Sequence, residues 1–120
     1  MPARESPRTR RVADRISAEL ADLLASRVED PRLRPLTVTG ARVSRDLTAA
    51  EVWVSGGFPE SEEPAVLAAL LRATPYLRSQ LAPRLGLRVV PTLRFTIDRS
   101  IETGARIEKL LRELHEPKGE

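Results

Sequence analysis

The chain contains no cysteine, few aromatic residues and a single histidine. Without cysteine it can form neither disulfides nor thiolate metal sites, and it has no cysteine nucleophile. The one histidine, His115, lies beside Glu113 and Glu116, where we interpret it as a solvated helix-end residue rather than a catalytic base. No P-loop, G-x-G-x-x-G motif or cluster of metal ligands is present. We therefore expect a protein that is not an enzyme and that uses no cofactor or metal.

Long hydrophobic runs are also missing. No stretch approaches the ~18 apolar residues that a membrane-spanning helix needs, and no apolar segment follows the N-terminal arginines as in a secretory signal. We therefore expect a cytoplasmic protein without a membrane partner. With 120 residues, of which 41% are hydrophobic, the chain can bury one core, built mainly from aliphatic side chains.

Lysine is nearly absent, whereas arginine is abundant and clustered. Of the 20 basic residues, only Lys109 and Lys118 are lysines, and the net charge is +3. Residues 1–15 carry +3 and residues 64–99 carry +5, whereas residues 16–63 carry −4. Genomic GC bias, which favours arginine codons, would explain much of the preference for arginine but not its clustering. Because guanidinium groups bind phosphates bidentately and stack on bases, the clusters favour nucleic-acid binding.

The first predicted element is a helix over residues 7–29. Ser6 is a suitable N-cap and Pro7 suits the first helical position. Apolar residues then recur at steps of three and four from Val12 to Val28, which is typical of one helix face. Pro31 disfavours helical geometry at the preceding residue and should end the helix nearby.

A hairpin is predicted next, from strands at 35–45 and 49–55, followed by a polar loop at 56–63. In the second strand, Ala50, Val52 and Val54 should share one face, and Glu51, Trp53 and Ser55 the other. We expect Trp53 to be at least partly covered, although it could also stack on a base.

Two helices separated by a sharp break are predicted after the loop. Ser61 is the expected N-cap of the first. Thr74 should cap a new helix that starts at Pro75, Pro83 should distort its last turn, and Gly86 should end it.

A strand over residues 87–97 and a helix over 99–115 complete the pattern. Leu87, Val89, Leu93, Phe95 and Ile97 should face the core, and Ser100 should cap the last helix. The predicted domain spans residues 7–115, with flexible tails at 1–6 and 116–120. Its α+β order, with a three-stranded sheet backed by helices, is that of the type II KH domain.

KH domains clamp single-stranded nucleic acid with a GXXG loop between two helices. This chain has Ala73-Thr74-Pro75 at that place, so binding should depend on charge instead. The predicted RNA-binding residues are Arg8, Arg10, Arg11, Arg15, Arg72, Ala73, Thr74, Arg78, Arg84, Arg88 and Arg94. We expect about half of these arginines to be merely solvated or paired with the acidic block.

Five runs occur in an order that resembles the ribosome-binding factor A family: residues 11–16 (RVADRI), 29–33 (EDPRL), 43–55 (VSRDLTAAEVWVS), 77–81 (LRSQL) and 87–95 (LRVVPTLRF). Asp98, Ser100 and residues 104–107 continue the resemblance, which covers residues 8–114. It implies a type II KH fold that binds the immature 30S subunit and assists late maturation of 16S rRNA without catalysis. The family usually has A-x-G at the kink. Pro75 replaces that glycine and offers no backbone donor. We therefore expect Arg72 and Arg78, rather than the backbone, to contact the RNA there.

The expected partner is therefore 16S rRNA within the 30S subunit. We expect a monomer that takes no small-molecule substrate. Two alternatives remain open from the sequence: a generic KH-like RNA-binding module, and an α+β protein-interaction domain.

Overall fold

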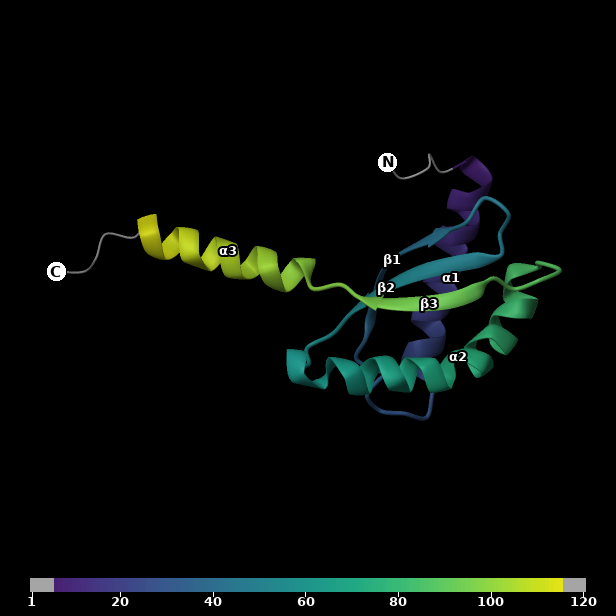
Figure 1. Cartoon of the computed structure of the whole chain (residues 1–120), viewed down its shortest axis with the longest axis horizontal. Helices are drawn as coiled ribbons and strands as arrows, with labels where there is room; N and C mark the ends of the chain where they lie inside the picture. Colours follow the sequence, from purple (N-terminus) through teal and green to yellow (C-terminus); the bar gives the residue numbers. More distant parts are fainter. Residues whose placement is uncertain (1–5, 116–120) are drawn as a thin grey trace.

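The computed structural model describes residues 6–115, and gives only the backbone for residues 101–106 and 115. The elements are α1 (Pro7–Ser26), β1 (Thr37–Val43), β2 (Ala49–Ser55), the 3-10 helix η1 (Glu60–Glu62), α2 (Glu63–Leu85), β3 (Thr92–Ile97) and α3 (Ser100–His115). Figure 1 shows this arrangement, which confirms the predicted α+β class. Within residues 6–115, no helix is both long and apolar enough to cross a bilayer.

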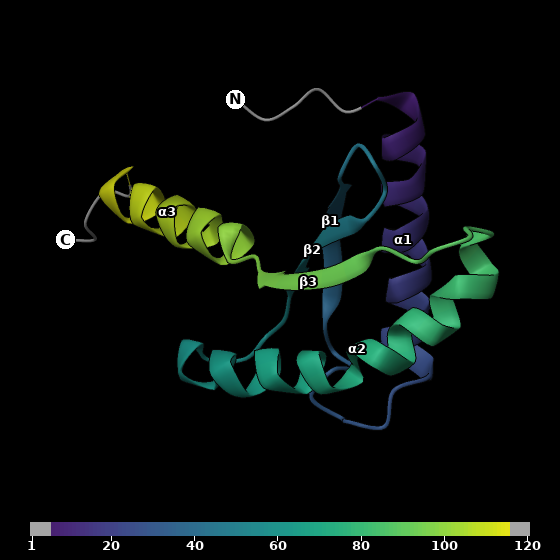
Figure 2. The ribbon, with the colours of Figure 1, turned by 45° about the vertical axis from the view of Figure 1, so that its right-hand side comes forward.

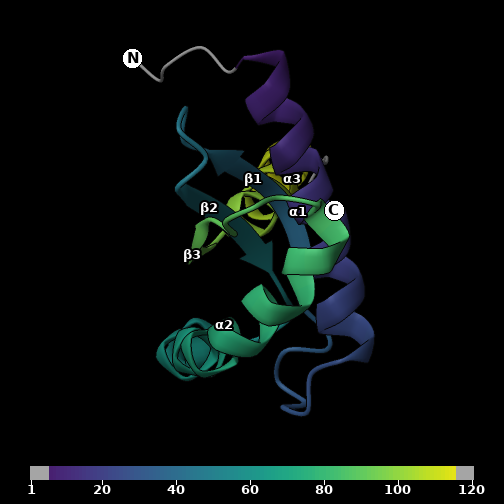
Figure 3. The ribbon, with the colours of Figure 1, turned by 90° about the vertical axis from the view of Figure 1, so that its right-hand side faces the viewer.

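The sheet has the strand order β1-β2-β3. β1 and β2 form the predicted antiparallel hairpin, with a register shift between Val38 and Gly40, and β3 pairs parallel to β2. Figure 3 shows α1 and α2 on the same side of the sheet. The alternation in β2 is confirmed, because Val52 and Val54 are fully buried whereas Glu51 is exposed. One face of the sheet therefore carries the core, and none of the described helices covers the other.

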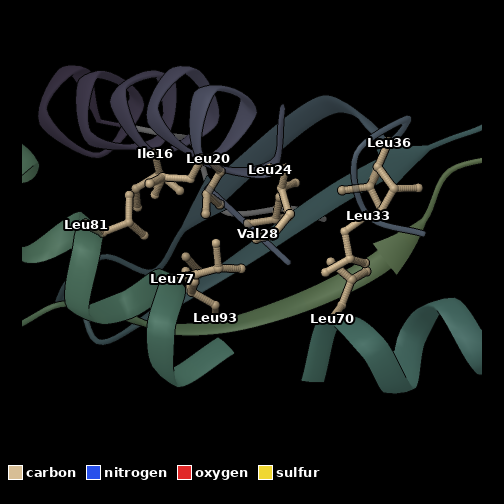
Figure 4. Packing of buried hydrophobic residues seen from close by; sticks show 14 of the residues in the cluster. Ile16, Leu20, Leu24, Val28, Leu33, Leu36, Leu70, Leu77, Leu81 and Leu93 are labelled. Carbon is tan, nitrogen blue, oxygen red and sulfur yellow. The ribbon is translucent and has the colours of Figure 1, made fainter. Parts of the chain in front are cut away.

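Aliphatic side chains from α1, α2 and the sheet form the core (Figure 4). Ile16 and Leu20 of α1 are fully buried, as are Leu77 and Leu81 of α2. The predicted N-cap is confirmed, since the Ser6 hydroxyl oxygen accepts a hydrogen bond from the backbone N–H of Thr9 at 3.2 Å. The apolar residues that recur every three or four positions thus form the buried face of α1, as predicted.

The predicted break in the middle of α2 is wrong, because one continuous helix bends there (Figure 2). Pro75 lacks an N–H and its ring crowds the carbonyl of Leu71, which bends a helix. The Thr74 hydroxyl does not cap a new helix but donates to the Leu70 carbonyl at 2.7 Å, a bond that also favours bending. Leu70 and Leu77 are both fully buried. Packing on either side of Pro75 therefore holds both halves in one helix.

Three boundaries near the first helix and the hairpin differ from the prediction. α1 ends at Ser26 rather than 29, where the N–H of Arg27 closes the last turn on the Leu23 carbonyl. Turns follow, one of them held by the Asp30 carboxylate, which accepts from the Arg32 N–H at 3.0 Å. β1 is Thr37–Val43 rather than 35–45. These turns take up residues that the pattern assigned to regular elements.

The start of α2 also differs, because Ser61 is not its N-cap. Ser61 lies inside η1, and the N-cap position of α2 belongs to Glu62, which makes no side-chain capping bond. At the other end the prediction is confirmed: Gly86 terminates α2 with φ +63°, a conformation that glycine adopts without strain.

Residues 87–91, predicted as part of the last strand, form an irregular segment, and β3 begins only at Thr92. Val89 is 68% exposed, whereas Val90 packs against the core, so the predicted facing of Val89 is wrong. Pro91 is buried just before the strand. Leu93 is buried, and Phe95 and Ile97 are partly buried and pack against the core, as predicted, but Thr96 between them is equally partly buried.

α3 projects away from the rest of the fold (Figure 1). Its apolar residues Ile107, Leu110, Leu111 and Leu114 are at least half exposed. Its root is anchored by Asp98, whose carboxylate accepts from the Ser100 N–H at 2.9 Å and from the Thr39 hydroxyl at 3.0 Å. Ser100 is thus the first residue of this helix, and the Asp98 carboxylate accepts the hydrogen bond from its N–H. The predicted tails, apart from Ser6, and the His115 side chain lie outside what the structure describes.

Candidate nucleic-acid interface

The first turns of α1 present three exposed arginines, Arg8, Arg10 and Arg11. Arg10 also lines a hollow of about 420 Å³ between α1 and residues 38–41 of β1. The predicted cluster therefore forms a basic surface at this end of α1, beside the edge of the sheet.

Arg15 and Arg84, also predicted to bind RNA, instead connect α1 with the end of α2. One guanidinium nitrogen of Arg84 lies 2.8 Å from a carboxylate oxygen of Glu19 and 2.9 Å from one of Asp22. Hydrogen bonds to Asp22 and then Glu19 raise the pKa of Arg84. Arg15 donates to the backbone carbonyl of Arg84. These two side chains hold the helices together, so less of their charge is available to a ligand.

Arg78 holds the irregular segment that precedes β3. Its side chain, which is partly buried, donates to the carbonyls of Val90 at 2.8 Å and Pro91 at 3.2 Å. Both acceptors belong to a segment without regular secondary structure. The guanidinium group therefore supplies hydrogen bonds that a neighbouring strand would supply in a sheet. Arg78 consequently positions β3 against α2.

A groove of about 420 Å³ lies between the end of α1 and the bend of α2. Arg72 lines it with 64% of its side chain exposed, and one of its guanidinium nitrogens lies 4.0 Å from the Asp30 carboxylate. Ala73 lines it too, whereas Thr74 is partly buried and committed to the Leu70 carbonyl. A long, solvent-exposed ion pair of this kind contributes little to the stability of the fold, so Arg72 can leave Asp30 and bind a phosphate.

Two residues of this groove were missed by sequence reasoning. Arg27 follows the last turn of α1, and Tyr76, which is 42% exposed, follows the bend of α2. The signal was weak, because neither lies in a charge cluster. A basic group and an aromatic ring beside the bend are nevertheless suited to nucleic acid.

The remaining predicted arginines, Arg88 and Arg94, are both exposed. Arg88 lies in the irregular segment before β3. Arg94 lies on the open face of the sheet, where the register places it beside Glu51, which in turn pairs with Arg42. Arg42 and the exposed Arg45 of the hairpin turn were not among the predicted residues, although strand alternation places Arg42 on the same face as Arg94.

The structure thus divides the predicted basic band into separate parts. Three of the nine predicted arginines, Arg15, Arg78 and Arg84, bond to other groups of the protein. Apart from Arg88, in the segment before β3, the exposed members gather at the start of α1, at the groove beside the bend, and on the open face of the sheet.

Comparisons with known proteins agree with one another. A family model described as ribosome-binding factor A matches residues 8–111. The ribosome-binding factor A of Thiobacillus denitrificans is 45% identical over 108 residues, covering 90% of this chain and 87% of the relative. The crystal structure of ribosome-binding factor A from Thermus thermophilus superposes with a TM-score of 0.67 at 33% identity, covering 77% of this chain and 98% of that one. A homology model of the Thermus thermophilus protein, fitted into a cryo-EM map of a 30S–RbfA complex, gives a TM-score of 0.61 at 34% identity, covering 72% and 91% of the two chains.

Proposed function

This chain belongs to the ribosome-binding factor A family, and on that premise we propose that it binds the immature 30S ribosomal subunit and assists late maturation of 16S rRNA. The observation that carries the proposal is the similarity, over nearly the whole chain, to ribosome-binding factors, one of which has been fitted into a map of a 30S complex. In this proposal the domain is of the type II KH kind, and the protein acts as a cytoplasmic monomer without catalysis.

The arginines at the start of α1 and Arg72 at the groove make the phosphate contacts in this proposal. Their exposure supports that role, since each guanidinium group can reach an RNA backbone without breaking a buried contact. Arg78 and Arg84 support the interface indirectly by fixing the segments around it. Ala73 and Thr74 shape the bend, and Pro75 provides no backbone donor there. Such a surface would hold one RNA conformation transiently by charge and shape.

Salt dependence tests the α1 surface. Each phosphate contact contributes roughly 0.7 to 0.9 to the slope of log affinity against log salt. Replacing Arg8, Arg10 and Arg11 with glutamine should therefore weaken binding to purified immature 30S subunits and lower that slope by about 2. The matched control is Arg34→Gln, because Arg34 is exposed but belongs to none of these surfaces.

Sucrose-gradient sedimentation tests the partner itself. The protein should migrate with immature 30S subunits at low salt and leave them at high salt. Failure of the unaltered protein to sediment with 30S particles would refute the ribosome proposal. Equal affinity for unrelated structured RNAs would favour a generic KH-like module, and binding to ribosomal proteins but not RNA would favour the protein-interaction alternative.

A further inference from the structure

The face of the sheet turned away from α1 and α2 has none of the described helices over it, as Figures 1 and 3 show. The outward positions of its three strands carry glycine, alanine, serine, threonine, arginine, one glutamate and Trp53. No large aliphatic side chain is among them. The face thus resembles neither a core surface nor a typical apolar protein interface.

Trp53 lies in the middle of this face. The strand register places it between Gly40 of β1 and Thr96 of β3. A Cβ atom built on Gly40 would lie 4.0 Å from Cε3 of the indole, so the ring extends over the bare backbone of Gly40. Because Gly40 has no side chain to cover it, the partly exposed ring is accessible for stacking by a planar group.

Three arginines lie at the hairpin end of the sheet. A hollow of about 460 Å³ there is lined by Arg42, Arg45, Arg94 and Glu51. It also reaches Thr9 of α1 and the core-facing Val43 and Ala50. Arg94 and Glu51 lie two positions from Thr96 and Trp53 along their strands, which is roughly 6.7 Å. This separation places the hollow within reach of the phosphate of a nucleotide whose base lies on Trp53.

Three arginines face two carboxylates at the hairpin end, Glu51 in the lining of the hollow and Asp46 in the turn, so positive charge is in excess there. The Asp46 carboxylate is turned into the hairpin, where it accepts hydrogen bonds from the Ser44 hydroxyl at 2.8 Å and from the Thr48 hydroxyl at 2.7 Å. Those bonds, with that of Thr48 as the largest cause, lower the pKa of Asp46. Glu51 is then the only carboxylate among the residues that line the hollow.

We propose that this open face binds single-stranded RNA, with a base stacked on Trp53 and its phosphate held in the hollow between Arg42, Arg45 and Arg94. The inference rests on the proposed role in RNA binding and adds a second contact to it. The hollow that Arg10 lines includes Gly40, the β1 residue that pairs with Trp53, so both contacts adjoin the same part of β1. Single strands are favoured over duplexes because only an unpaired base can leave its own stack to lie on an aromatic ring.

Fluorescence of Trp53, the single tryptophan of the chain, tests the proposal directly. The full-length protein would be titrated with a ten-nucleotide oligoadenylate and, separately, with a ten-base-pair RNA duplex. The single strand should quench Trp53 emission saturably, and the duplex should not. Trp53→Ala should weaken oligoadenylate binding, measured by the polarisation of a labelled strand, by about fivefold or more. Trp53→Phe should retain most of the affinity because it keeps an aromatic face.

A matched pair on neighbouring strands tests the charges. Arg94→Gln should weaken oligoadenylate binding, whereas Glu51→Gln should strengthen it, and the circular dichroism of both variants should match that of the original protein. Oligoadenylate that binds without changing Trp53 emission, or a duplex that quenches it equally, would overturn the proposal. If oligoadenylate does not bind while 30S subunits still do, this inference fails and the proposed function stands.

Discussion

Replacing Arg78 with alanine should destabilise the fold by about 2 to 3 kcal/mol. The side chain makes two charge-assisted hydrogen bonds, to the carbonyls of Val90 and Pro91. Bonds of this kind contribute about 1.5 to 3 kcal/mol each, or about 3 to 6 kcal/mol for the pair; the longer bond and water entering the gap reduce the expected loss to about 2 to 3 kcal/mol. A loss of about 2 kcal/mol would lower the melting temperature of a domain of this size by roughly 8 to 16 °C.

Urea denaturation followed by circular dichroism measures the effect of Arg78→Ala, because a lower midpoint at an unchanged slope reports stability alone. Arg78→Lys should lose most of the same stability while keeping the charge, since an ammonium group cannot span two carbonyls as a guanidinium group does. Arg88→Ala is the control, because Arg88 lies exposed in the same segment. If Arg78→Ala and Arg88→Ala unfold within about 0.5 kcal/mol of each other, Arg78 does not hold this segment.

Three further outcomes are expected. Leu70→Ala should lower the free energy of unfolding, measured in urea, by about 2 to 5 kcal/mol because Leu70 is fully buried. Leu71→Ala, at a position 74% exposed, should lower it by less than about 0.5 kcal/mol. Equal losses would contradict the assigned faces of α2. Hydrogen bonds from Ser100, and then from Thr39, lower the pKa of Asp98 from 3.8, so this carboxylate stabilises the fold above that pH, and the stabilisation is lost as the pH falls through the lowered pKa. Asp98→Asn should therefore lower the melting temperature at pH 7, by an amount that shrinks as the pH falls below 3.8, and a pH-independent difference would contradict this role of Asp98. A chain ending at Ser100 should unfold within about 0.5 kcal/mol of the full chain, because the described apolar side chains of α3 are exposed; a larger loss would mean that α3 packs on the core in solution.

Local chemistry explains why much of the fold could be predicted. The periodic apolar residues of α1, the Ser6 cap, the alternation in β2 and the glycine at the end of α2 act through neighbours a few residues away. Such effects are visible in a sequence because the interacting groups lie within one turn or one strand of each other.

The middle of α2 could not be predicted from local chemistry alone. Pro75 favours a helix break, and the prediction followed that preference. Buried leucines on both sides of the proline keep the helix continuous, because tertiary packing outweighs a local preference once each half contacts the core. The Thr74 hydroxyl, predicted as a cap, then bonds backwards along the same helix.

Most helices and strands, most of the core-facing residues and the arginine clusters could be predicted from the sequence, and the order of its motifs indicated the family. Only the tertiary structure decided which arginines are available to a ligand. Arg84 meets Glu19 across 65 positions, and Arg78 meets the Pro91 carbonyl across 13. Because such partners meet only after the chain has folded, charge clustering along the sequence could not distinguish arginines that hold the fold together from those on its surface.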